Sequence, residues 1–508
     1  MKVLLINCPV RERAPPYSLN LGLAYLISFL RKAKHKVEVL DINGYRYSRE
    51  EVEEKIKELK YDMVCTGGLI TQYKYLKFLT PLLKKYHPDK PVVIGGNIAN
   101  EIPHLLFVHT STDIVMLGEA EETICELADA LEKGTPLKNV NGMAYKENGK
   151  IIYTAPRKII ENIDTIPFPE WDLFPVEEYI NNYKKVANNY RAMPMIITRG
   201  CPFVCKFCYH SFMGDKARFR SADNIIAEMK HLIEKYKINS IMFYDDLFLL
   251  NRKIVEELCN KMIEQKLNLK WNCLTRLEML DENLILKMKK AGCIFISYGM
   301  ESGSQTILDN MRKGINLQKA KETYNRVKKL GLITFGTFMI GYPGENMKTI
   351  RETVDYCKEL GLPAEFFFAT PYPGTSLYEE WKHKIPDEDK YVESLGDVYD
   401  LKLNMTDFSD EELIKIRESI EQELRKYCYS RPWIVARLIK YHYLQWGIKN
   451  TVISSLKKLY NFIPFAKVLH SNYIRRKPDH TKMQVQKAPA TADQNKLEYA
   501  KKAATANA

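Results

Sequence analysis

The chain has 508 residues, 45% of them hydrophobic, which is too long for one hydrophobic core and predicts about two to four domains. Its 11 cysteines are an odd number and mostly scattered, so a disulfide framework is excluded and a reducing cytoplasm is expected. The net charge of +13 is uneven, because residues 424–478 contain twelve Lys and Arg and no Asp or Glu.

Two apolar stretches near the N-terminus bear on membrane insertion. The first, MKVLLINCPVRERAPP, has a short apolar run followed by charges, unlike a signal peptide. The second, LGLAYLISFL, is too short to span a bilayer. We therefore expect a soluble, cytoplasmic protein or one attached to the inner face of the membrane.

Residues 1–119 alternate between short apolar runs and amphipathic stretches. The runs are KVLLIN, KVEVLD, DMVCTGG, PVVIGG and DIVMLGE. This alternation predicts a parallel, doubly wound α/β sheet of the flavodoxin-like (Rossmann-type) class. Ligands of such sheets bind beyond the carboxyl ends of the strands, where glycine lets a ligand approach the backbone closely. The candidate ligand contacts at these ends are Thr66, Gly67, Gly68, Gly95, Gly96, Asn97, Gly118 and Glu119.

Residues 141–190 predict a hairpin followed by a linker. The sequence NGMAYKENGKIIYT predicts a β-hairpin that turns at Asn148 and Gly149. The stretch IPFPEWDLFPVEEY contains three prolines and little periodicity, which favours an ordered linker. We place the first domain at residues 1–145 and the linker at residues 146–190.

A second alternating series begins near Met193. Its strands are MPMIITR, NSIMFYDD, WNCLTR, CIFISYG, ITFGTFMI and AEFFFAT. Six strands predict a partial (β/α)6 TIM-like barrel over residues 191–385, open on one side, since a full barrel has eight. A helical region, residues 386–480, follows and includes the predicted helix DFSDEELIKIRESIEQELRKY. The tail, residues 481–508, is expected to be disordered.

The stretch RGCPFVCKFCYH places three cysteines, Cys201, Cys205 and Cys208, directly after the first barrel strand. There they lie at the carboxyl-end face, where barrels perform their chemistry. Three thiolates can hold a [4Fe-4S] cluster and leave one iron without a protein ligand. The alternatives are three core cysteines, or a zinc site with His210 as the fourth ligand.

The cysteine motif CxxxCxFC resembles that of the radical S-adenosylmethionine (SAM) superfamily. The stretches ARFRSADNIIAEM, FYDDLFLLNR, SYGMESGS, GTFMIGYPGE and TPYPGTSLY follow in the order in which that family would place them. A flavodoxin-like domain before the barrel, with GGN, GEAEET and IPFPEWDLFP, resembles the cobalamin-binding group of the superfamily over residues 1–381. The resemblance implies a [4Fe-4S] cluster, SAM and cobalamin as cofactors and places zinc far behind.

The resemblance also implies how SAM is held. Its amino and carboxylate groups would bind the iron that the cysteines leave open, and the reduced cluster would cleave it to a 5′-deoxyadenosyl radical. Arg276 would pair with the SAM carboxylate, and Glu301 would contact the ribose. The alternatives are a surface salt bridge for Arg276 and a charge at a helix N-terminus for Glu301.

Further SAM contacts are implied at neighbouring strand ends. Asp245 and Asp246 end the second barrel strand, where the family often contacts the methionyl amine. Neighbours on a strand point to opposite faces, so only one of them is expected to face the barrel. The sequence GYPGE suits a close backbone approach to adenine at Gly341 and Gly344, and Phe207 completes the expected cofactor contacts.

Cobalamin domains often carry a D-x-H-x-x-G motif whose histidine binds cobalt. The aligned stretch DINGYR keeps Asp41 but has Asn43 in place of the histidine and Arg46 in place of the glycine. Asparagine is a poor cobalt ligand, so two hypotheses stay open. Either cobalamin binds without a protein imidazole, which we favour because glycines end three successive strands, or the domain is a vestige that binds nothing.

The resemblance favours a radical C-methyltransferase. The 5′-deoxyadenosyl radical would take hydrogen from an unactivated carbon, methylcobalamin would donate a methyl group, and a second SAM would restore the methyl donor. The main alternative is radical chemistry without methyl transfer, such as the anaerobic oxidative cyclisation that forms a chlorophyll precursor ring. A cobalamin-dependent regulator is a distant third, because the cysteine motif is complete. An electron donor such as flavodoxin or ferredoxin is expected.

The basic segment, residues 424–478, combines cations with aromatic and aliphatic residues. This composition suits an anionic membrane surface, with aromatic rings at headgroup level, and would then point to a lipid substrate such as an isoprenoid or hopanoid. Packing on the open side of the barrel is an equal alternative, and nucleic acid is less favoured. The substrate is otherwise expected to be a small molecule.

Overall fold

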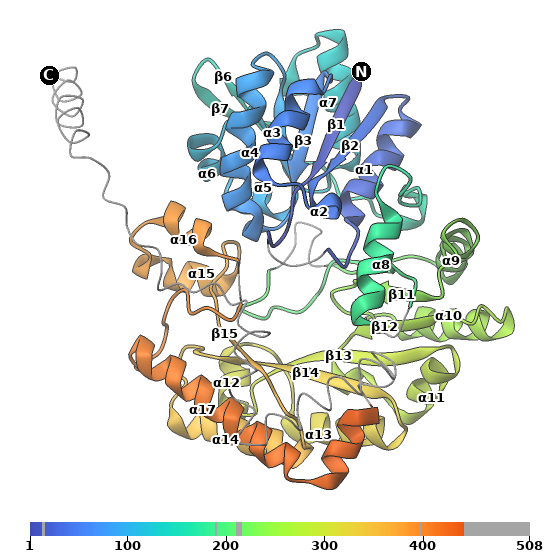
Figure 1. Ribbon diagram of the computed structural model, residues 1–508, viewed down its shortest axis with the longest axis vertical. Coiled ribbons are helices and arrows are strands. Elements are labelled where there is room, and N and C mark those ends of the chain that lie inside the picture. Colours follow the sequence, from blue (N-terminus) through green and yellow to red (C-terminus); the bar gives the residue numbers. More distant parts are fainter. Residues whose placement is uncertain (13–15, 188–189, 210–215, 397, 441–508) are drawn as a thin grey trace, which may run out of the picture. The chain divides into compact units, whose positions relative to one another are not determined.

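The computed structural model describes residues 1–12, 16–187, 190–209, 216–396 and 398–440 (Figure 1). The chain divides into two compact units, Met1–Ile448 and Lys449–Ala508, and the second lies outside the described residues. Three predictions fall outside them as well: His210 as a zinc ligand, the basic segment beyond residue 440, and the tail at residues 481–508.

A seven-stranded sheet forms the centre of the N-terminal domain. Its strands are β1 (Lys2–Asn7), β2 (Lys36–Asp41), β3 (Met63–Gly67), β4 (Val92–Gly95), β5 (Ile114–Met116), β6 (Met143–Glu147) and β7 (Lys150–Tyr153). They lie in the order β2-β1-β3-β4-β5-β6-β7, and the first five run parallel, which confirms the predicted flavodoxin-like topology. The last two form the predicted hairpin, and its turn residues Asn148 and Gly149 have positive φ angles of 50° and 75°.

Helices cover both faces of this sheet (Figure 1). They are α1 (Leu21–Lys32), α2 (Ile42–Tyr45), α3 (Arg49–Glu58), α4 (Tyr73–Tyr86), α5 (Asn97–Glu101), α6 (Pro103–His109) and α7 (Ala120–Lys133). On β1, Val3 and Leu5 pack with α1 and α7 in one core, whereas Leu4 and Ile6 pack with α3 and α4 in another. This is the alternation that a strand buried on both faces requires.

The segment that joins the two sheets, residues 154–191, is ordered and packs into the core. Trp171 is fully buried, and α8 (Val176–Val186), which the sequence did not predict, begins directly after Pro175. The sheet also continues to Tyr153, so the predicted boundary at residue 145 falls inside β6.

A six-stranded parallel sheet forms the second domain and confirms the predicted partial barrel. Its strands are β8 (Ala192–Met195), β11 (Ser240–Phe243), β12 (Lys270–Leu274), β13 (Cys293–Glu301), β14 (Ile333–Ile340) and β15 (Phe366–Phe368). They lie side by side in chain order, with β8 and β15 at the two edges. A small antiparallel pair, β9 (Thr198–Arg199) and β10 (Arg218–Phe219), flanks the first strand.

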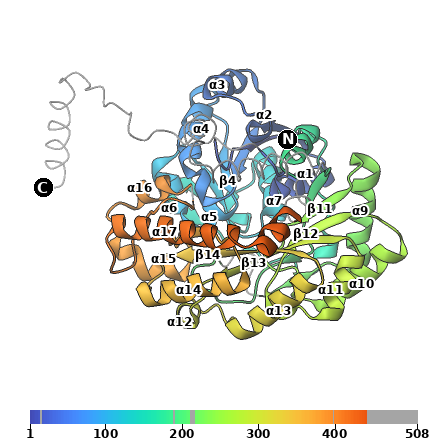
Figure 2. The same ribbon diagram turned by 60° about the horizontal axis from the view of Figure 1, so that its bottom comes forward.

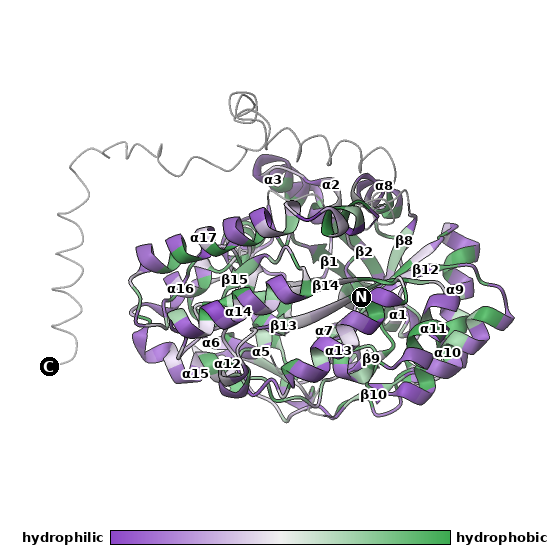
Figure 3. Ribbon diagram, turned by 90° about the horizontal axis from the view of Figure 1, so that it is seen from below, coloured by the Kyte–Doolittle hydropathy of each residue, from purple (hydrophilic) through white to green (hydrophobic). Residues whose placement is uncertain are grey.

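Amphipathic helices surround this sheet, and their ribbons carry both hydrophilic and hydrophobic residues (Figure 3). They are α9 (Ala222–Tyr236), α10 (Arg252–Glu264), α11 (Glu282–Lys290), α12 (Gln305–Asn310), α13 (Leu317–Lys329) and α14 (Met347–Leu360). Most begin at a capping side chain. Ser221, for example, accepts a hydrogen bond from the backbone of Asn224 at the start of α9.

Three further helices, α15 (Ser376–Trp381), α16 (Glu388–Ser394) and α17 (Asp410–Tyr429), follow the barrel. α17 is the predicted C-terminal helix, and it packs along α14 (Figure 2). α16 instead contacts the N-terminal domain: Asp389 pairs with Lys77 at 2.7 Å and accepts a hydrogen bond from the Tyr73 hydroxyl at 2.6 Å. The chain therefore returns to its first domain after completing the barrel.

Candidate active site

The three cysteines lie in the loop that follows β9, here called the cysteine loop, residues 200–209. Desolvation raises the pKa of all three thiols, and the charges of Cys205 and Asp246 raise that of Cys208 further, to about 12. A bound cation is therefore needed to hold them as thiolates.

Asp245 and Asp246 have different surroundings. Asp245 is buried, and its Oδ1 accepts hydrogen bonds from Ile197 N at 2.8 Å, Thr198 N at 2.6 Å and Thr198 Oγ1 at 2.8 Å. Burial raises the pKa of Asp245 to about 6. Asp246 is exposed, and its charge acts on Cys201 and Cys208. Asp245 therefore holds the strand before the cysteine loop, and Asp246 is the member of the pair that faces it.

Arg276, at the end of β12, reaches the cysteine loop. Its guanidinium lies over the Phe203 ring, 4.1 Å from the centroid. Nε and Nη2 donate to Glu278 at 3.1 and 2.8 Å, whereas Nη1 is buried and has no hydrogen-bond partner among the described residues. A buried donor without a partner is costly, so Nη1 is suited to a ligand carboxylate.

Glu301, at the end of β13, is paired with a residue that the sequence analysis did not identify. Lys313 Nζ lies 3.0 Å from Glu301 Oε1 and 5.3 Å from the centre of the Phe207 ring. The positive charge of Lys313 also lowers the pKa of Cys205, against the larger effect of burial. Lys313 thus belongs to the surroundings of the cysteine loop, although no motif in the sequence marks it.

The GYPGE turn contains a buried carboxylate. Gly341 and Gly344 have φ angles of 86° and 85°, and Glu345 accepts hydrogen bonds from Gly341 N at 2.6 Å and Tyr342 N at 3.1 Å. A Cβ at Gly341 would lie 3.1 Å from Leu413 of α17. The Gly341 position is therefore shaped by its own turn and by the C-terminal helix.

Most of the glycines that end the N-terminal strands are needed for packing. A Cβ at Gly67 would lie 2.0 Å from Gly95 O, and one at Gly96 would lie 3.0 Å from Gly68 N. Thr66 is also turned inward, since its hydroxyl donates to Ile6 O at 3.0 Å. At Gly67 and Gly96, the absence of a side chain thus allows the loops after β3 and β4 to pack closely against each other.

Gly118 differs from these glycines. Its φ angle is 73°, and a Cβ built on it would meet no atom within 4 Å. Of the glycines predicted to contact a ligand in this domain, Gly118 is the one that adjoins open space.

Asp41 and Asn43 belong to a buried hydrogen-bond network. The Asp41 carboxylate accepts from Asn7 Nδ2 at 2.8 Å and from the Tyr179 hydroxyl at 2.9 Å. Asn43 Nδ2 donates to the same hydroxyl at 3.1 Å. Arg46, in place of the motif glycine, keeps a left-handed conformation with φ 59°. The position of the motif glycine thus has a backbone conformation that glycine adopts readily, although Arg46 occupies it here.

Three residues of the protein bind the Glu119 carboxylate. Its carboxylate is bound by Arg218 Nη1 and Nη2, both at 2.9 Å, by Arg199 Nη1 at 2.9 Å and by Ile160 N at 2.8 Å. Burial alone would raise the pKa of Glu119, but Arg218 and Arg199 outweigh it, so the pKa lies below its usual value. The predicted cofactor contact is, in this structure, an ion pair between the two domains.

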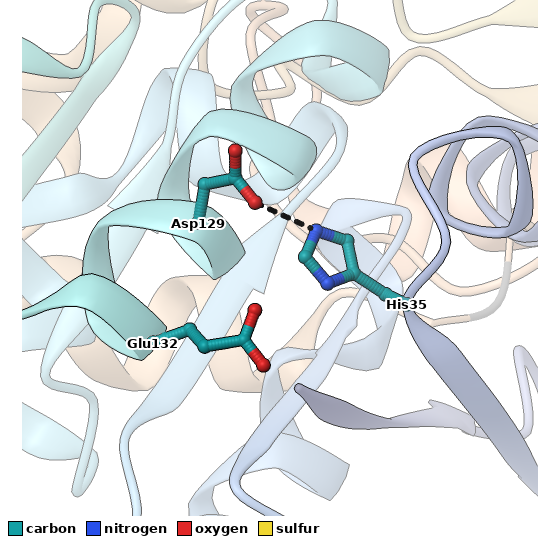
Figure 4. Close-up of side chains that lie close together, drawn as sticks. All are labelled: His35, Asp129 and Glu132. Carbon is teal, nitrogen blue, oxygen red and sulfur yellow. Dashed lines mark ion pairs between the residues drawn. The ribbon is translucent and has the colours of Figure 1, made fainter.

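His35, Asp129 and Glu132 form the group of ligand-type side chains that Figure 4 shows. His35 Nε2 lies 3.4 Å from Asp129. Asp129 also pairs with Lys133 at 2.9 Å, and Glu132 pairs with the amino group of Met1 at 2.5 Å. The carboxylates are satisfied by these cations, and the group lies beside the first residues of β1 and β2, away from the strand carboxyl ends.

Comparison with known proteins agrees with this arrangement. The model of the B12 binding domain matches residues 8–128, and that of the Radical SAM superfamily matches residues 195–357. The chain is 34% identical to an uncharacterized methyltransferase of Pyrococcus horikoshii, over 68% of this chain and 75% of that protein. It is 29% identical to an anaerobic magnesium-protoporphyrin IX monomethyl ester cyclase of Rubrivivax gelatinosus, over 64% of this chain and 59% of the cyclase.

A solved structure shares the fold. The radical SAM methyltransferase TsrM of Kitasatospora setae, with cobalamin and a [4Fe-4S] cluster bound, is 18% identical and has a TM-score of 0.63 over 75% of each chain. The two matching domains, their order and these relatives together show that the chain belongs to the cobalamin-binding radical SAM enzymes, whose cofactors are a [4Fe-4S] cluster, SAM and cobalamin.

Proposed function

We propose that the protein methylates an unactivated carbon of its substrate by radical chemistry. One observation carries the proposal. Glu119, next to the open strand end at Gly118, is bound at 2.9 Å by Arg199, which lies two residues before Cys201. The ligand-facing ends of the two sheets are thus adjacent, as a transfer between SAM-derived and cobalamin-borne groups requires.

When bound, the reduced cluster and SAM supply a 5′-deoxyadenosyl radical, and cobalamin supplies the methyl group. The residues of the chain hold and orient these groups. Cys201, Cys205 and Cys208 would bind three irons. The free Nη1 of Arg276 would take the SAM carboxylate, and Asp246 would accept from the methionyl amine.

Two further contacts complete the proposed SAM site. Glu301 would accept from the ribose hydroxyls while Lys313 balances its charge. The backbone at Gly341 and Gly344 would approach the adenine, with their positive φ angles permitting the turn.

On the cobalamin side, the backbone at Gly118 offers room for close approach. Asn43 is engaged by Tyr179 at 3.1 Å, and an amide is a poor cobalt ligand. Cobalamin would therefore bind without a nitrogen ligand from this motif. Phe207 would contribute to the cysteine loop by packing beneath Lys313.

The test is product analysis under anaerobic conditions. Reconstituted protein with dithionite, SAM and a cell extract as the source of the methyl acceptor should yield 5′-deoxyadenosine and S-adenosylhomocysteine together over several turnovers, and iron and cobalt should both be present. A variant with all three loop cysteines replaced by alanine should yield neither the deoxyadenosine nor the iron. Deoxyadenosine without S-adenosylhomocysteine would favour the alternative, an oxidative cyclase, for which the similarity to the Rubrivivax enzyme is the supporting observation.

The partners and location of the enzyme are separate proposals. None of the described helices is both long and apolar enough to cross a membrane. Within the described part of the basic segment, however, the helix at residues 432–440 exposes Trp433 by 68% and Ile439 by 44%. We propose that these exposed side chains contact an anionic membrane surface, consistent with a lipid substrate, and that a flavodoxin or ferredoxin supplies the electron.

Vesicle binding tests the membrane contact. The protein should sediment with vesicles containing phosphatidylglycerol but not with pure phosphatidylcholine, and Trp433→Ala should weaken sedimentation. Tyr153→Ala is the matched control, because Tyr153 is an exposed aromatic residue, at 56%, outside the basic segment. Equal sedimentation of both variants and the parent protein would contradict the contact.

A further inference from the structure

Four charged side chains from the two domains are buried together. They are Glu119 and Glu121 at the start of α7, Arg199 of β9 and Arg218 of β10, and each side chain is between 2% and 9% exposed. Arg199 binds both carboxylates, at 2.9 Å to Glu119 and 2.6 Å to Glu121. The two charges of each sign balance, and we call this set the ion-pair group.

The backbone geometry brings the two arginines to one carboxylate. Arg199 and Arg218 are directly opposite each other on the antiparallel pair β9–β10. Tyr25 of α1 lies over the Arg199 guanidinium at 5.3 Å and shields it from solvent. Arg218 in addition donates to Ile160 O at 2.6 Å, so the segment between the domains is tied into the same group.

Each end of the ion-pair group adjoins a cofactor-binding element. Glu119 directly follows Gly118, the open strand end of the cobalamin-binding domain. Arg199 is separated from Cys201 by one glycine, Gly200, which has a φ angle of 88°. Residues 197–199 are consequently held from two sides, by Asp245 of the barrel and by the glutamates of the other domain.

Stability alone does not account for such a group. A buried ion-pair network can often be replaced by apolar side chains at no loss of stability, because desolvation of the charges offsets their attraction. What directional, bidentate pairs provide is a defined geometry. Here they fix the distance and orientation of the cysteine loop relative to the strand end at Gly118.

We propose that the ion-pair group is a positioning device that fixes the [4Fe-4S] cluster relative to cobalamin. Glu119, Glu121, Arg199 and Arg218 touch neither cofactor in this proposal and act through the cysteine loop and the Gly118 turn. The inference rests on the proposed function, in that it requires both cofactors to be bound in one active site.

The test measures the separation of the cofactors directly. In holoprotein, the reduced cluster and cob(II)alamin are both paramagnetic, and the cluster accelerates the spin relaxation of cob(II)alamin to an extent that falls steeply with distance. The parent protein should show a single accelerated relaxation rate. Glu119→Gln, which removes the shared charge, should lose this single rate and show a spread of slower rates at unchanged iron and cobalt content.

A control separates positioning from destabilisation. Trp271 is fully buried inside the barrel domain, and its Nε1 donates to Ala291 O at 3.0 Å. Trp271→Phe should therefore lower the thermal stability while it keeps the single relaxation rate. If Glu119→Gln does not fold, Glu121→Gln decides: it removes one of the two bonds from Arg199 to the other domain, so it should also spread the rates, while the bond to Glu119 remains.

The outcomes distinguish the two proposals. A parent protein that binds both cofactors but shows no accelerated relaxation would overturn the proposed function. Unchanged relaxation in Glu121→Gln, and in Glu119→Gln if it folds, with acceleration present in the parent protein, would overturn the positioning role alone. The same spread of rates in Trp271→Phe would also overturn it, since the effect would then follow from lost stability.

Discussion

Replacement of Asp245 by alanine is expected to destabilise the strand that leads into the cysteine loop. The carboxylate accepts from two backbone groups, Ile197 N and Thr198 N, and from the Thr198 hydroxyl. The hydroxyl can rotate to another acceptor, but the two backbone donors are buried and would lose theirs. Each unsatisfied donor costs about 1–3 kcal/mol, so Asp245→Ala should reduce the free energy of unfolding by about 2–6 kcal/mol.

Urea denaturation followed by circular dichroism measures this loss, and iron content after reconstitution reports on the loop. Thr198→Val provides a graded comparison, because it removes only the side-chain bond at 2.8 Å and should cost about 0.5–1.5 kcal/mol. Asp245→Ala should also retain less iron than Thr198→Val. If Asp245→Ala lost no more stability than Thr198→Val, the role assigned to Asp245 would be refuted.

Three further predictions concern buried groups near the site. Burial raises the pKa of Glu345 from 4.5 to about 7. The protonated carboxyl therefore contributes about 3 kcal/mol to the free energy of unfolding below about pH 4.5, and this contribution is lost as the pH rises through about 7. Glu345→Gln should remove this pH dependence in urea titrations at several pH values. Lys313→Met should make the cluster potential more negative in an EPR-monitored redox titration, because it removes a cation beside Cys205, and an unchanged potential would contradict this. Tyr179→Phe should cost about 1–3 kcal/mol of stability and weaken cobalamin binding in an equilibrium titration, because Asp41 and Asn43 lose their shared partner, whereas wild-type affinity would argue against that network.

The fold was predictable where the sequence is periodic. The parallel strands of both sheets, the hairpin at Asn148 and the helix at α17 all follow from short apolar runs, turn residues and capping side chains. Helix α8 was missed because three prolines precede it, and the helix begins only after Pro175. The prolines favour irregular backbone up to Pro175, and this signal obscured the helix that begins at the next residue.

The site was predictable only in part, for a different reason. The cysteines are grouped within eight residues, so their pattern is visible in the sequence. The partners of Glu119 lie 80 and 99 residues away, and Tyr179 lies 138 residues from Asp41. Such contacts are created by the fold, and a glycine that serves the packing of two loops, such as Gly67, has the same appearance in the sequence as one that admits a ligand.

The return of the chain to its first domain through α16 limits how the two domains can be exchanged between relatives. Tyr391 and Val392 are buried in the same core as helices α3 and α4, and Asp389 binds Lys77 and Tyr73. An isolated N-terminal domain would expose this apolar patch to water. A chimaera that grafts a foreign cobalamin domain onto this barrel would have to bring a matching α16 with it, so inheritance of the two halves is coupled by a helix that lies outside both.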